Sequence, residues 1–528
     1  MDETATTATT PTHDLTGAEA LVRTLADCGV EVCFANPGTS EMQFVDALGR
    51  TGLLRCVLGL FEGVATGAAD GYARMAGKPA ATLLHLGPGL ANAGANIHNA
   101  RKARTPMVNL VGDHASRHLA YDAPLTSDIA ALAKPLSDWV RTAGSAATIA
   151  SDGAAAVAEA MAWPGRIATL IAPGEAGWDQ GATLADPLAS RGPRALGEAD
   201  LQAAVTALQA PGQTVLFVGG PALASADTLA LLAGLAAKTG AEVLAPTSNP
   251  RIERGRGRAA IERLPYAIDL ALERLSHIER AILIGVDQPV GFFAYPGKPS
   301  LMLPEGAEVL TLAAPDQDGR EAVTVLAERL GVTPLIPADA PEPEAPAPGE
   351  LTPETLATAV AAALPEHAIV IDEGITAGRA VWPATAGCPP HTWLALTGGA
   401  IGIGPPLALG AAVACPERPV VAIQADGSAM YTIQALWSQA REGANVTTVV
   451  LANRRYDILR HELFKVGANP GPQALSLLDI GNPALDFVAL ARAQGVEASR
   501  VTCPAALAHA IAASVRKPGP QLIEAVLP

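Results

Sequence analysis

Two polar residues, Asp426 and Asn453, stand 27 positions apart, and each follows an apolar run. The runs 420–424 and 447–451 are typical of buried strands, and residues 431–442 between them are typical of a helix. In a right-handed strand–helix–strand unit, both residues lie at the carboxyl ends of parallel strands, where open α/β sheets bind ligands. A carboxylate, an amide oxygen and a nearby main-chain carbonyl form an all-oxygen set that suits Mg²⁺. The spacing therefore predicts a metal ion that holds a diphosphate at this edge of the sheet.

The segment Asp426-Gly427-Ser428 is expected to begin a helix after the first of these strands. Free backbone N–H groups and the positive end of the helix dipole would then face the same crevice. Taken singly, an Asp after a strand is most often a helix cap, and an Asn there is most often part of a turn. The combination at this spacing is what favours a ligand site.

The composition excludes several classes of function. The chain has 528 residues, 49% of them hydrophobic, and a net charge of −16 without a long basic run, which argues against nucleic acid and anionic membranes as partners. Its six cysteines lack metal-binding spacing and indicate buried thiols in a reducing compartment, so we expect a cytoplasmic protein. Residues 393–416 carry no charge, but their glycines and prolines favour a strand, loop and helix over a membrane span.

Proline-rich segments divide the chain into three blocks. Residues 1–14 are rich in Thr and Ala and are expected to be disordered, and they resemble neither a secretory signal nor a transit peptide. The expected domains are 15–180, 197–335 and 351–528, joined by residues 181–196 and by the proline-rich linker 336–350. Each block alternates strand-like and helical stretches, which predicts the α/β class with three doubly wound parallel-sheet domains.

A carboxyl group stands at a similar junction in the first block. Residues 57–61 are typical of a strand and 63–75 of a helix, with Glu62 between them. The simplest explanation is that Glu62 stabilises the positive end of that helix, by about 0.3–1 kcal/mol. A catalytic carboxyl group at the sheet edge is the alternative.

Two motifs together resemble those of thiamine-diphosphate (ThDP) enzymes: FEGVATGAADGYAR at 61–74, and the Asp-Gly to Asn spacing that begins at Asp426. The resemblance implies that Asp426 and Asn453 bind Mg²⁺ by their side chains and Arg455 by its main-chain carbonyl. It also implies that Glu62 hydrogen-bonds the aminopyrimidine of the cofactor and promotes its activation. Two positions depart from the family pattern, because Ala425 replaces a glycine and Arg454 places a bulky cation beside the metal loop. Metal binding then requires that the Arg454 side chain points outward.

The same resemblance assigns residues in GGAIGIGPP at 398–406. Ile401 would support the bent cofactor, and the carbonyl of Gly399 would accept a hydrogen bond from its 4′-amino group. Thr376 and Ser428 would place hydroxyl groups against the diphosphate. From the residues alone, Ile401 could equally be filling of the hydrophobic core. The family arrangement further implies a homodimer or homotetramer in which Glu62 of one subunit serves the cofactor held by another.

The resemblance is strongest to the branch with acetolactate synthase large subunits and benzoylformate decarboxylase. In FANPGTSEMQF at 34–44, Thr39 occupies the position of the active-site serine of the decarboxylase, and His85 matches one of its histidines. A histidine there can transfer a proton, although His85 could be structural; His114, after the strand 107–112, is a second candidate. The other decarboxylase histidine is replaced within VGFFAYPG at 290–297, which predicts an apolar wall of the pocket. Residues 461–472 are expected to close over the substrate.

The resemblance implies an enzyme that uses ThDP and Mg²⁺ to decarboxylate a small 2-oxo acid. Carboligation like that of acetolactate synthase is the first choice, and a decarboxylation of the benzoylformate type is the alternative. A catalytically silent ThDP-binding paralogue and a flavin electron-transfer protein are two further classes. The stretch VLFVGGPAL at 215–223 places two glycines after a strand, which is a weak signal, so FAD is the less favoured cofactor.

Overall fold

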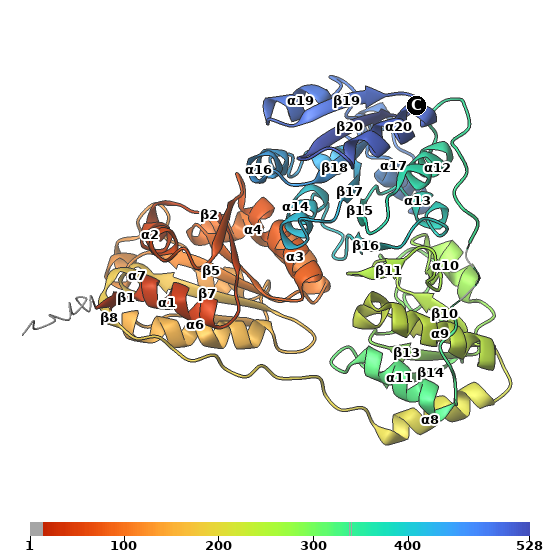
Figure 1. Ribbon diagram of the computed structural model, residues 1–528, viewed down its shortest axis with the longest axis horizontal. Helices are drawn as coiled ribbons and strands as arrows, with labels where there is room; N and C mark the ends of the chain where they lie inside the picture. Colours follow the sequence, from red (N-terminus) through yellow and green to blue (C-terminus); the bar gives the residue numbers. More distant parts are fainter. Residues whose placement is uncertain (1–13, 337, 339) are drawn as a thin grey trace, which may run out of the picture.

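The computed structural model describes residues 14–336, 338 and 340–528. The segment expected to be disordered therefore lies, except for Asp14, outside the described residues. Three main sheets of six, five and seven strands organise the described chain (Figure 1), and all their strand pairings are parallel except one at the edge of the third sheet. This confirms the α/β class with three parallel-sheet domains.

The first sheet has the strand order β3-β2-β4-β5-β7-β6, and all its pairings are parallel. A short antiparallel pair, β1 with β8, stands beside it. The strands and helices of this domain are β1 (Leu15–Thr16), α1 (Gly17–Asp27), β2 (Val32–Asn36), α2 (Met42–Thr51), β3 (Arg55–Leu58), α3 (Glu62–Ala76), β4 (Ala80–Leu84), α4 (Leu86–Lys102), β5 (Met107–Asp113), α5 (Ile129–Ala133), β6 (Trp139–Thr142), α6 (Ala146–Ala160), β7 (Ile167–Pro173), α7 (Gly174–Trp178) and β8 (Gln180–Ala182).

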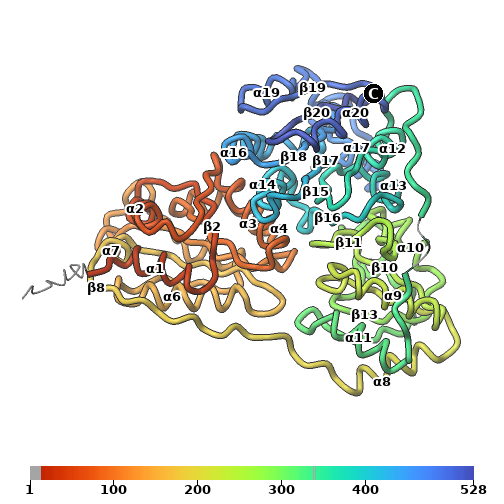
Figure 2. The backbone as a smooth tube through the Cα atoms, viewed as in Figure 1, coloured from red at the N-terminus to blue at the C-terminus, as the bar shows by residue number. Residues whose placement is uncertain are grey.

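The chain then crosses in an extended segment to the central domain (Figure 2). The central sheet is parallel, with the order β12-β10-β9-β13-β14. Its elements, together with β11, are α8 (Glu198–Gln209), β9 (Thr214–Val218), α9 (Ala226–Thr239), β10 (Glu242–Ala245), β11 (Ile252–Arg254), β12 (Glu262–Arg263), α10 (Ile268–Leu275), β13 (Arg280–Ile284), β14 (Glu308–Ala313) and α11 (Gly319–Arg329).

The third sheet has the order β11-β16-β15-β17-β18-β20-β19, and β11 from the central part of the chain pairs with it antiparallel at the edge. Its elements are α12 (Pro353–Ala363), β15 (Ile369–Glu373), α13 (Val381–Ala384), β16 (His391–Ala395), α14 (Gly404–Ala414), β17 (Val420–Ala425), α15 (Asp426–Ala429), α16 (Ala435–Glu442), β18 (Val446–Ala452), α17 (Asp457–Lys465), α18 (Pro472–Ser476), α19 (Phe487–Ala493), β19 (Glu497–Val501), α20 (Pro504–Ser514) and β20 (Gln521–Val526). No helix among the described residues is long and apolar enough to cross a membrane.

The helix expected at 431–442 is shorter than predicted. The chain makes the brief helix α15 directly after β17 and becomes helical again only at Ala435. Between them the backbone forms i+3 turns, and the Thr432 hydroxyl donates to the carbonyl of Gly402 at 2.7 Å. A side chain bonded to a distant loop thus replaces the first turn of the expected helix, so a long helix dipole does not face the crevice.

Helices α3 and α14 join the first and third domains by direct contact of their backbones. A Cβ added at Gly71 would lie 2.1 Å from the carbonyl oxygen of Leu407, and one added at Gly410 would lie 1.8 Å from that of Ala68. These glycines are therefore required for the close approach of the two helices. The contact fixes the start of α3, where Glu62 lies, relative to the third sheet (Figure 1).

Arg74, near the end of α3, connects all three parts of the chain. Its guanidinium group forms a buried ion pair with Asp70 at 2.5 Å and donates to the carbonyl of Ala395 at 2.8 Å in the third domain. It also donates to the carbonyl of Pro250, at 3.3 Å, in the central part of the chain. The side chains of Arg74 and Asp70 are 2% and 0% exposed, so each buried charge is compensated by the opposite charge of its partner.

We expect Arg74→Ala to lower the stability of the folded chain by about 3–5 kcal/mol, because it leaves the Asp70 carboxylate buried without its cation. The measurement is the midpoint of urea unfolding, followed by circular dichroism. The control is Arg320→Ala, which removes a partly exposed ion pair with Asp318 and should cost about 0–1 kcal/mol. Equal losses in the two variants would contradict the role of Arg74.

Candidate active site

A narrow pocket opens at the carboxyl ends of β15, β17 and β18, as the spacing of Asp426 and Asn453 predicts. Its walls include seven residues singled out from the sequence, namely Thr376, Ile401, Asp426, Gly427, Ser428, Asn453 and Arg455. The strand ends therefore bring together the predicted metal and diphosphate residues, which lie on three separate stretches of the chain.

Asp426 is held in place by its own loop and by the loop after β18. One carboxylate oxygen accepts the N–H of Gly427 at 2.7 Å, and the other accepts the N–H of Arg454 at 2.6 Å. Burial raises the pKa of Asp426, and these backbone N–H groups oppose that rise. The Asn453 side-chain oxygen accepts the N–H of Arg455 at 3.2 Å. The two oxygen ligands expected for a metal ion are thus oriented by backbone hydrogen bonds.

Arg454 adopts a left-handed backbone conformation, with φ of 60°. This conformation is uncommon for a residue other than glycine and turns the N–H of Arg454 toward Asp426. The residue is exposed to solvent, so its cation does not fill the metal loop. The departure from the family pattern at this position is therefore compatible with a metal ion beside Asp426.

Glu373, at the end of β15, is a site residue that the sequence did not reveal. It is 1% exposed, and its carboxylate accepts the N–H groups of Gly402 and Gly404, both at 2.6 Å. Burial raises its pKa, and the hydrogen bonds from the Gly404 and Gly402 N–H groups act in the opposite direction. The carboxylate thereby fixes the loop that carries Ile401, and an acidic residue ending an apolar strand was the available signal.

Glu62 begins α3 and is 7% exposed. Its carboxylate accepts a hydrogen bond from the Asn92 side chain of α4 at 2.9 Å. A Cβ added at Gly89 would lie 3.0 Å from a Glu62 carboxylate oxygen and 3.3 Å from the Cβ of His85. Glu62 and His85 therefore flank the same glycine at the start of α4, although they are far apart in the sequence.

His85 is oriented by a buried carboxylate, Glu41, that no sequence pattern indicated. Its Nδ1 lies 2.9 Å from Glu41 and 3.2 Å from the Ser40 hydroxyl, which also donates to Glu41 at 2.8 Å. Glu41 is 0% exposed, and a Cβ at Gly38 would lie 2.1 Å from the imidazole. The ring is thus held by Nδ1, which leaves Nε2 to exchange a proton with a ligand.

The other predicted residues of the first domain are less closely connected. Thr39 is exposed, and it is the adjacent Ser40 that contacts His85. His114 follows β5, and its ring packs against His118 with centroids 5.4 Å apart. Its Nε2 is buried without a partner among the described residues. The structure therefore places Glu62 and His85 beside the same glycine, and no hydrogen bond or ring contact among the described residues links Thr39 or His114 to either.

An aromatic cluster covers the loop at Gly399. A Cβ added at Gly399, which has a φ of 77°, would lie 2.7 Å from the ring of Phe292. The Phe292 ring lies against those of Tyr266 and Phe293, at centroid distances of 5.2 and 5.0 Å, and the Tyr295 hydroxyl donates to Glu462 of α17 at 2.9 Å. The Phe292 ring therefore forms an apolar wall beside Gly399, and the loop after β13 meets α17 through the hydrogen bond between Tyr295 and Glu462.

Comparison with known proteins identifies the two domains that carry the site residues predicted from the sequence. Residues 15–132 match the N-terminal TPP binding domain of thiamine pyrophosphate enzymes, and residues 376–525 match their C-terminal TPP binding domain. A Mycobacterium tuberculosis protein, "Putative acetolactate synthase large subunit IlvX", is 50% identical over 97% of this chain and 99% of its own. The chain belongs to the thiamine pyrophosphate enzyme family. It is accordingly a ThDP-dependent enzyme.

Two further relatives cover nearly the whole chain. Benzoylformate decarboxylase of Pseudomonas aeruginosa is 31% identical over 92% of this chain and 94% of its own. The solved structure of a ThDP-dependent 4-hydroxybenzoylformate decarboxylase of Rhodococcus jostii RHA1 aligns with a TM-score of 0.85 and 25% identity, over 97% of this chain and 99% of its own. The names of these relatives therefore cover both acetolactate synthase and benzoylformate decarboxylase, the two enzymes whose motifs the sequence resembles.

The residues at the pocket fit the diphosphate end of ThDP. Asp426, Asn453 and the carbonyl of Arg455 offer hard oxygen donors, which is the chemistry that Mg²⁺ selects when phosphate oxygens complete its shell. The named residues that line this pocket all lie between 374 and 458. Glu62 and His85 are thus not among the residues that line it within one chain.

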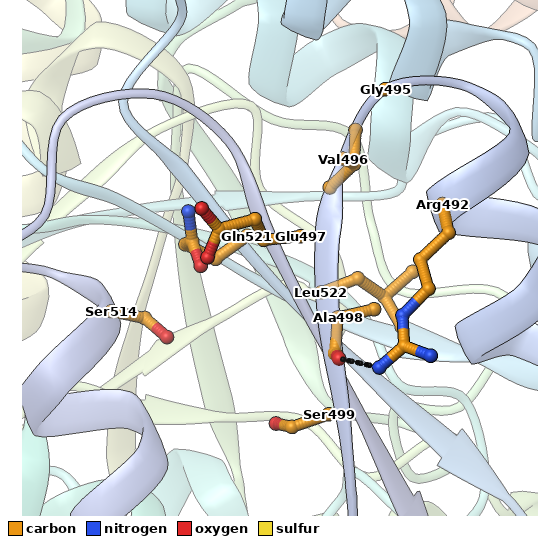
Figure 3. Close-up of a pocket in the computed structure, with 9 residues that line it drawn as sticks. All are labelled: Arg492, Gly495, Val496, Glu497, Ala498, Ser499, Ser514, Gln521 and Leu522. Carbon is orange, nitrogen blue, oxygen red and sulfur yellow. Dashed lines mark hydrogen bonds between the residues drawn. The ribbon is translucent and has the colours of Figure 1, made fainter.

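Another hollow, of about 440 Å³, lies away from these residues beside β19 and β20 (Figure 3). Arg492 there donates to the carbonyl of Ala498 at 3.2 Å, as the dashed line marks. None of the predicted site residues lines this hollow. It therefore contributes nothing to the ThDP site.

Proposed function

We propose that the protein uses ThDP and Mg²⁺ to decarboxylate a small 2-oxo acid and to join the remaining acyl group to a second oxo acid, as in acetolactate synthesis. The observation that carries this proposal is the Phe292 ring against Gly399. A phenyl ring has no proton to give, so this wall favours reaction with a carbon acceptor over release of an aldehyde. The relative that bears an acetolactate synthase name, at 50% identity, supports the same choice.

The side chains divide the chemistry between them. When bound, ThDP supplies the electron sink for loss of CO₂ from a 2-oxo acid. Asp426, Asn453 and the carbonyl of Arg455 would hold Mg²⁺ and the diphosphate, with Thr376 and Ser428 adding hydroxyl donors. Glu62 would hold a proton at the aminopyrimidine, and His85 would exchange one at Nε2 with the reacting substrate.

We further propose that the active site forms between two subunits of a homo-oligomer. The diphosphate residues line one pocket of the third domain, and Glu62 lies outside that pocket on the first domain. A partner chain whose first domain faces the pocket would complete the site. The Rhodococcus jostii enzyme shares the fold of the whole chain, with a TM-score of 0.85, and membership of the thiamine pyrophosphate enzyme family supports this arrangement.

Non-oxidative decarboxylation is the second candidate function, favoured by the arrangement of His85, Glu41 and Ser40. A histidine held in this way can protonate a carbanion and release an aldehyde. The deciding experiment incubates the protein with ThDP, Mg²⁺ and either pyruvate or benzoylformate, and identifies the products. Acetolactate from pyruvate supports carboligation, whereas an aldehyde alone supports the second candidate. Absence of both products would contradict the proposed function.

FAD remains the less favoured cofactor, because the glycines after β9 have explanations within the protein. A Cβ at Gly219 would lie 2.3 Å from a methyl group of Val286. Gly220 has a φ of 62°, which favours glycine. The sequence signal for a flavin is thus accounted for by packing and backbone conformation.

For His85, we expect substitution by Ala to change the ratio of aldehyde to ligated product at least about tenfold, since general acid–base groups contribute about 10²–10⁴-fold. Glu41→Gln should move the ratio in the same direction by less, because it weakens the orientation of the ring but keeps its nitrogen. The measurement is product analysis after a single turnover. His277→Ala, on the exposed surface of the central domain, is the matched control. A ratio unchanged in His85→Ala would remove His85 from proton transfer.

A further inference from the structure

A large cationic cavity, distinct from the ThDP pocket, lies where the first domain, the extended connecting segment and the central domain meet. Its volume is about 950 Å³. It is lined by the end of α4, the loop before β7, residues 191–194 and a residue after β14. Six Lys and Arg residues line it, against two Asp residues, and they are Arg101, Lys102, Arg104, Arg166, Arg191 and Arg194.

Three of these cations have no acidic side chain of their own. Arg194 forms a two-bond pair with Asp316, at 2.9 and 3.0 Å, and Arg101 and Arg166 pair with Asp138 and Glu159. Lys102, Arg104 and Arg191 are exposed, and their side chains make no hydrogen bond or ion pair with any residue between 14 and 528 that the structure describes. The cavity therefore carries a local positive charge on a chain whose net charge is −16.

Such a concentration of like charge needs a physical reason. Cations that share a concave wall repel one another, and the wall focuses their field into the cavity. An anion bound there would relieve that repulsion and accept hydrogen bonds from several groups at once. A single carboxylate would engage only one or two of these side chains, because they come from three separate segments of the chain.

We propose that this cavity binds a small molecule that carries a di- or triphosphate group. Arginine forks match phosphate oxygens in geometry, and a chain of two or three phosphates offers several such oxygens to the Lys102, Arg104 and Arg191 side chains that line the cavity. A volume of about 950 Å³ admits a ligand of nucleotide size. Trp163 lines the same cavity and offers an aromatic surface to a base or ring attached to the phosphates.

The placement of the cavity separates it from the chemistry at Asp426. None of the residues that line one of the two sites also lines the other. The proposal therefore does not depend on the proposed function. His98, which lines the cavity, has its Nε2 3.0 Å from the carbonyl oxygen of Gly398, so the cavity shares helix α4 with the loop of Gly399.

The test is isothermal titration of the full chain saturated with ThDP and Mg²⁺, so that the diphosphate pocket is filled. Pyrophosphate, ADP and adenosine are the three probes, each at low and at moderate salt. We expect pyrophosphate and ADP to bind, more weakly at moderate salt, and adenosine to leave no measurable heat. Tighter binding of ADP than of pyrophosphate would identify a nucleotide, and equal binding would identify the phosphates alone; both support the proposal.

The decisive variant is Lys102→Glu/Arg191→Glu, which should weaken binding of both phosphates at least about tenfold. Lys102→Gln/Arg191→Gln removes the two charges without adding acids, and it should weaken binding by less than the charge reversal does. This variant separates the loss of binding from any effect that the new acids have on folding. The matched control is Arg23→Glu/Arg516→Glu, which makes the same change of net charge at two exposed residues outside the cavity. The proposal is overturned if wild type binds neither phosphate, if adenosine binds as tightly as ADP, or if control and cavity variants lose equal affinity.

Discussion

Asp426→Ala is expected to lose binding of ThDP with Mg²⁺ by at least about 100-fold, since even partners one step removed from a metal ion are worth about 10–100-fold. Asp426 offers the only full negative charge among the proposed ligands, and its two oxygens are already aimed by the N–H groups of Gly427 and Arg454. The measurement is titration of the metal-free protein with ThDP at fixed Mg²⁺.

Two variants sharpen this prediction. Asp426→Asn keeps the shape and the hydrogen-bond acceptor but loses the charge, so it should fall between wild type and Asp426→Ala. Glu497→Ala removes an exposed acid of the same domain, which pairs with Lys517, and should bind ThDP as wild type does. The stabilisation of wild type against heat by ThDP and Mg²⁺ should disappear in Asp426→Ala alone. Wild-type affinity in Asp426→Ala would show that the metal site has been misplaced.

The positions of Asp426 and Asn453 could be predicted because these two residues are close in the sequence. Asp426 and Asn453 belong to one strand–helix–strand unit, whose parallel strands place both residues at the same edge of the sheet. Thr376 and Ile401 follow two other strands of the same sheet and reach the same edge for the same reason. Apolar runs and turn residues placed Asp426 and Asn453, even though the helix between them is shorter than expected, whereas Thr376 and Ile401 were assigned by the resemblance to family motifs.

Contacts between distant segments could not be predicted in this way. Glu41 reaches His85 across 44 residues, and Asn92 reaches Glu62 across 30, without any periodic pattern that relates them. Glu373 holds a loop 29 residues away by accepting hydrogen bonds from its backbone N–H groups. Because almost every residue type has such a group, the sequence of that loop does not indicate the contact. The addition of β11 to the third sheet likewise depends on how two domains pack. Such contacts follow from tertiary packing and become visible only in the folded chain.

Glu62→Gln is expected to lower kcat for every accepted 2-oxo acid by about 10²–10⁴-fold, the usual contribution of a positioned acid–base group. The amide can still accept the hydrogen bond from Asn92, so the start of α3 should keep its structure. ThDP should bind nearly as in wild type, because the diphosphate residues are untouched. Glu19→Gln changes an acid in the first turn of α1 of the same domain and is the matched control, with no expected loss of kcat.

Coexpression of Glu62→Gln with Asp426→Ala tests whether the two residues act across a subunit boundary. In a mixed dimer, one active site receives Glu62 from the Asp426→Ala chain and Asp426 from the Glu62→Gln chain, so that site is intact. Half of randomly assembled dimers are mixed and each has one intact site, so about a quarter of wild-type activity should return. Separately purified variants that have not exchanged subunits should show only their residual rates. If coexpression yields no more than the sum of those rates, Glu62 and Asp426 do not meet between subunits, and the proposed oligomeric site is wrong.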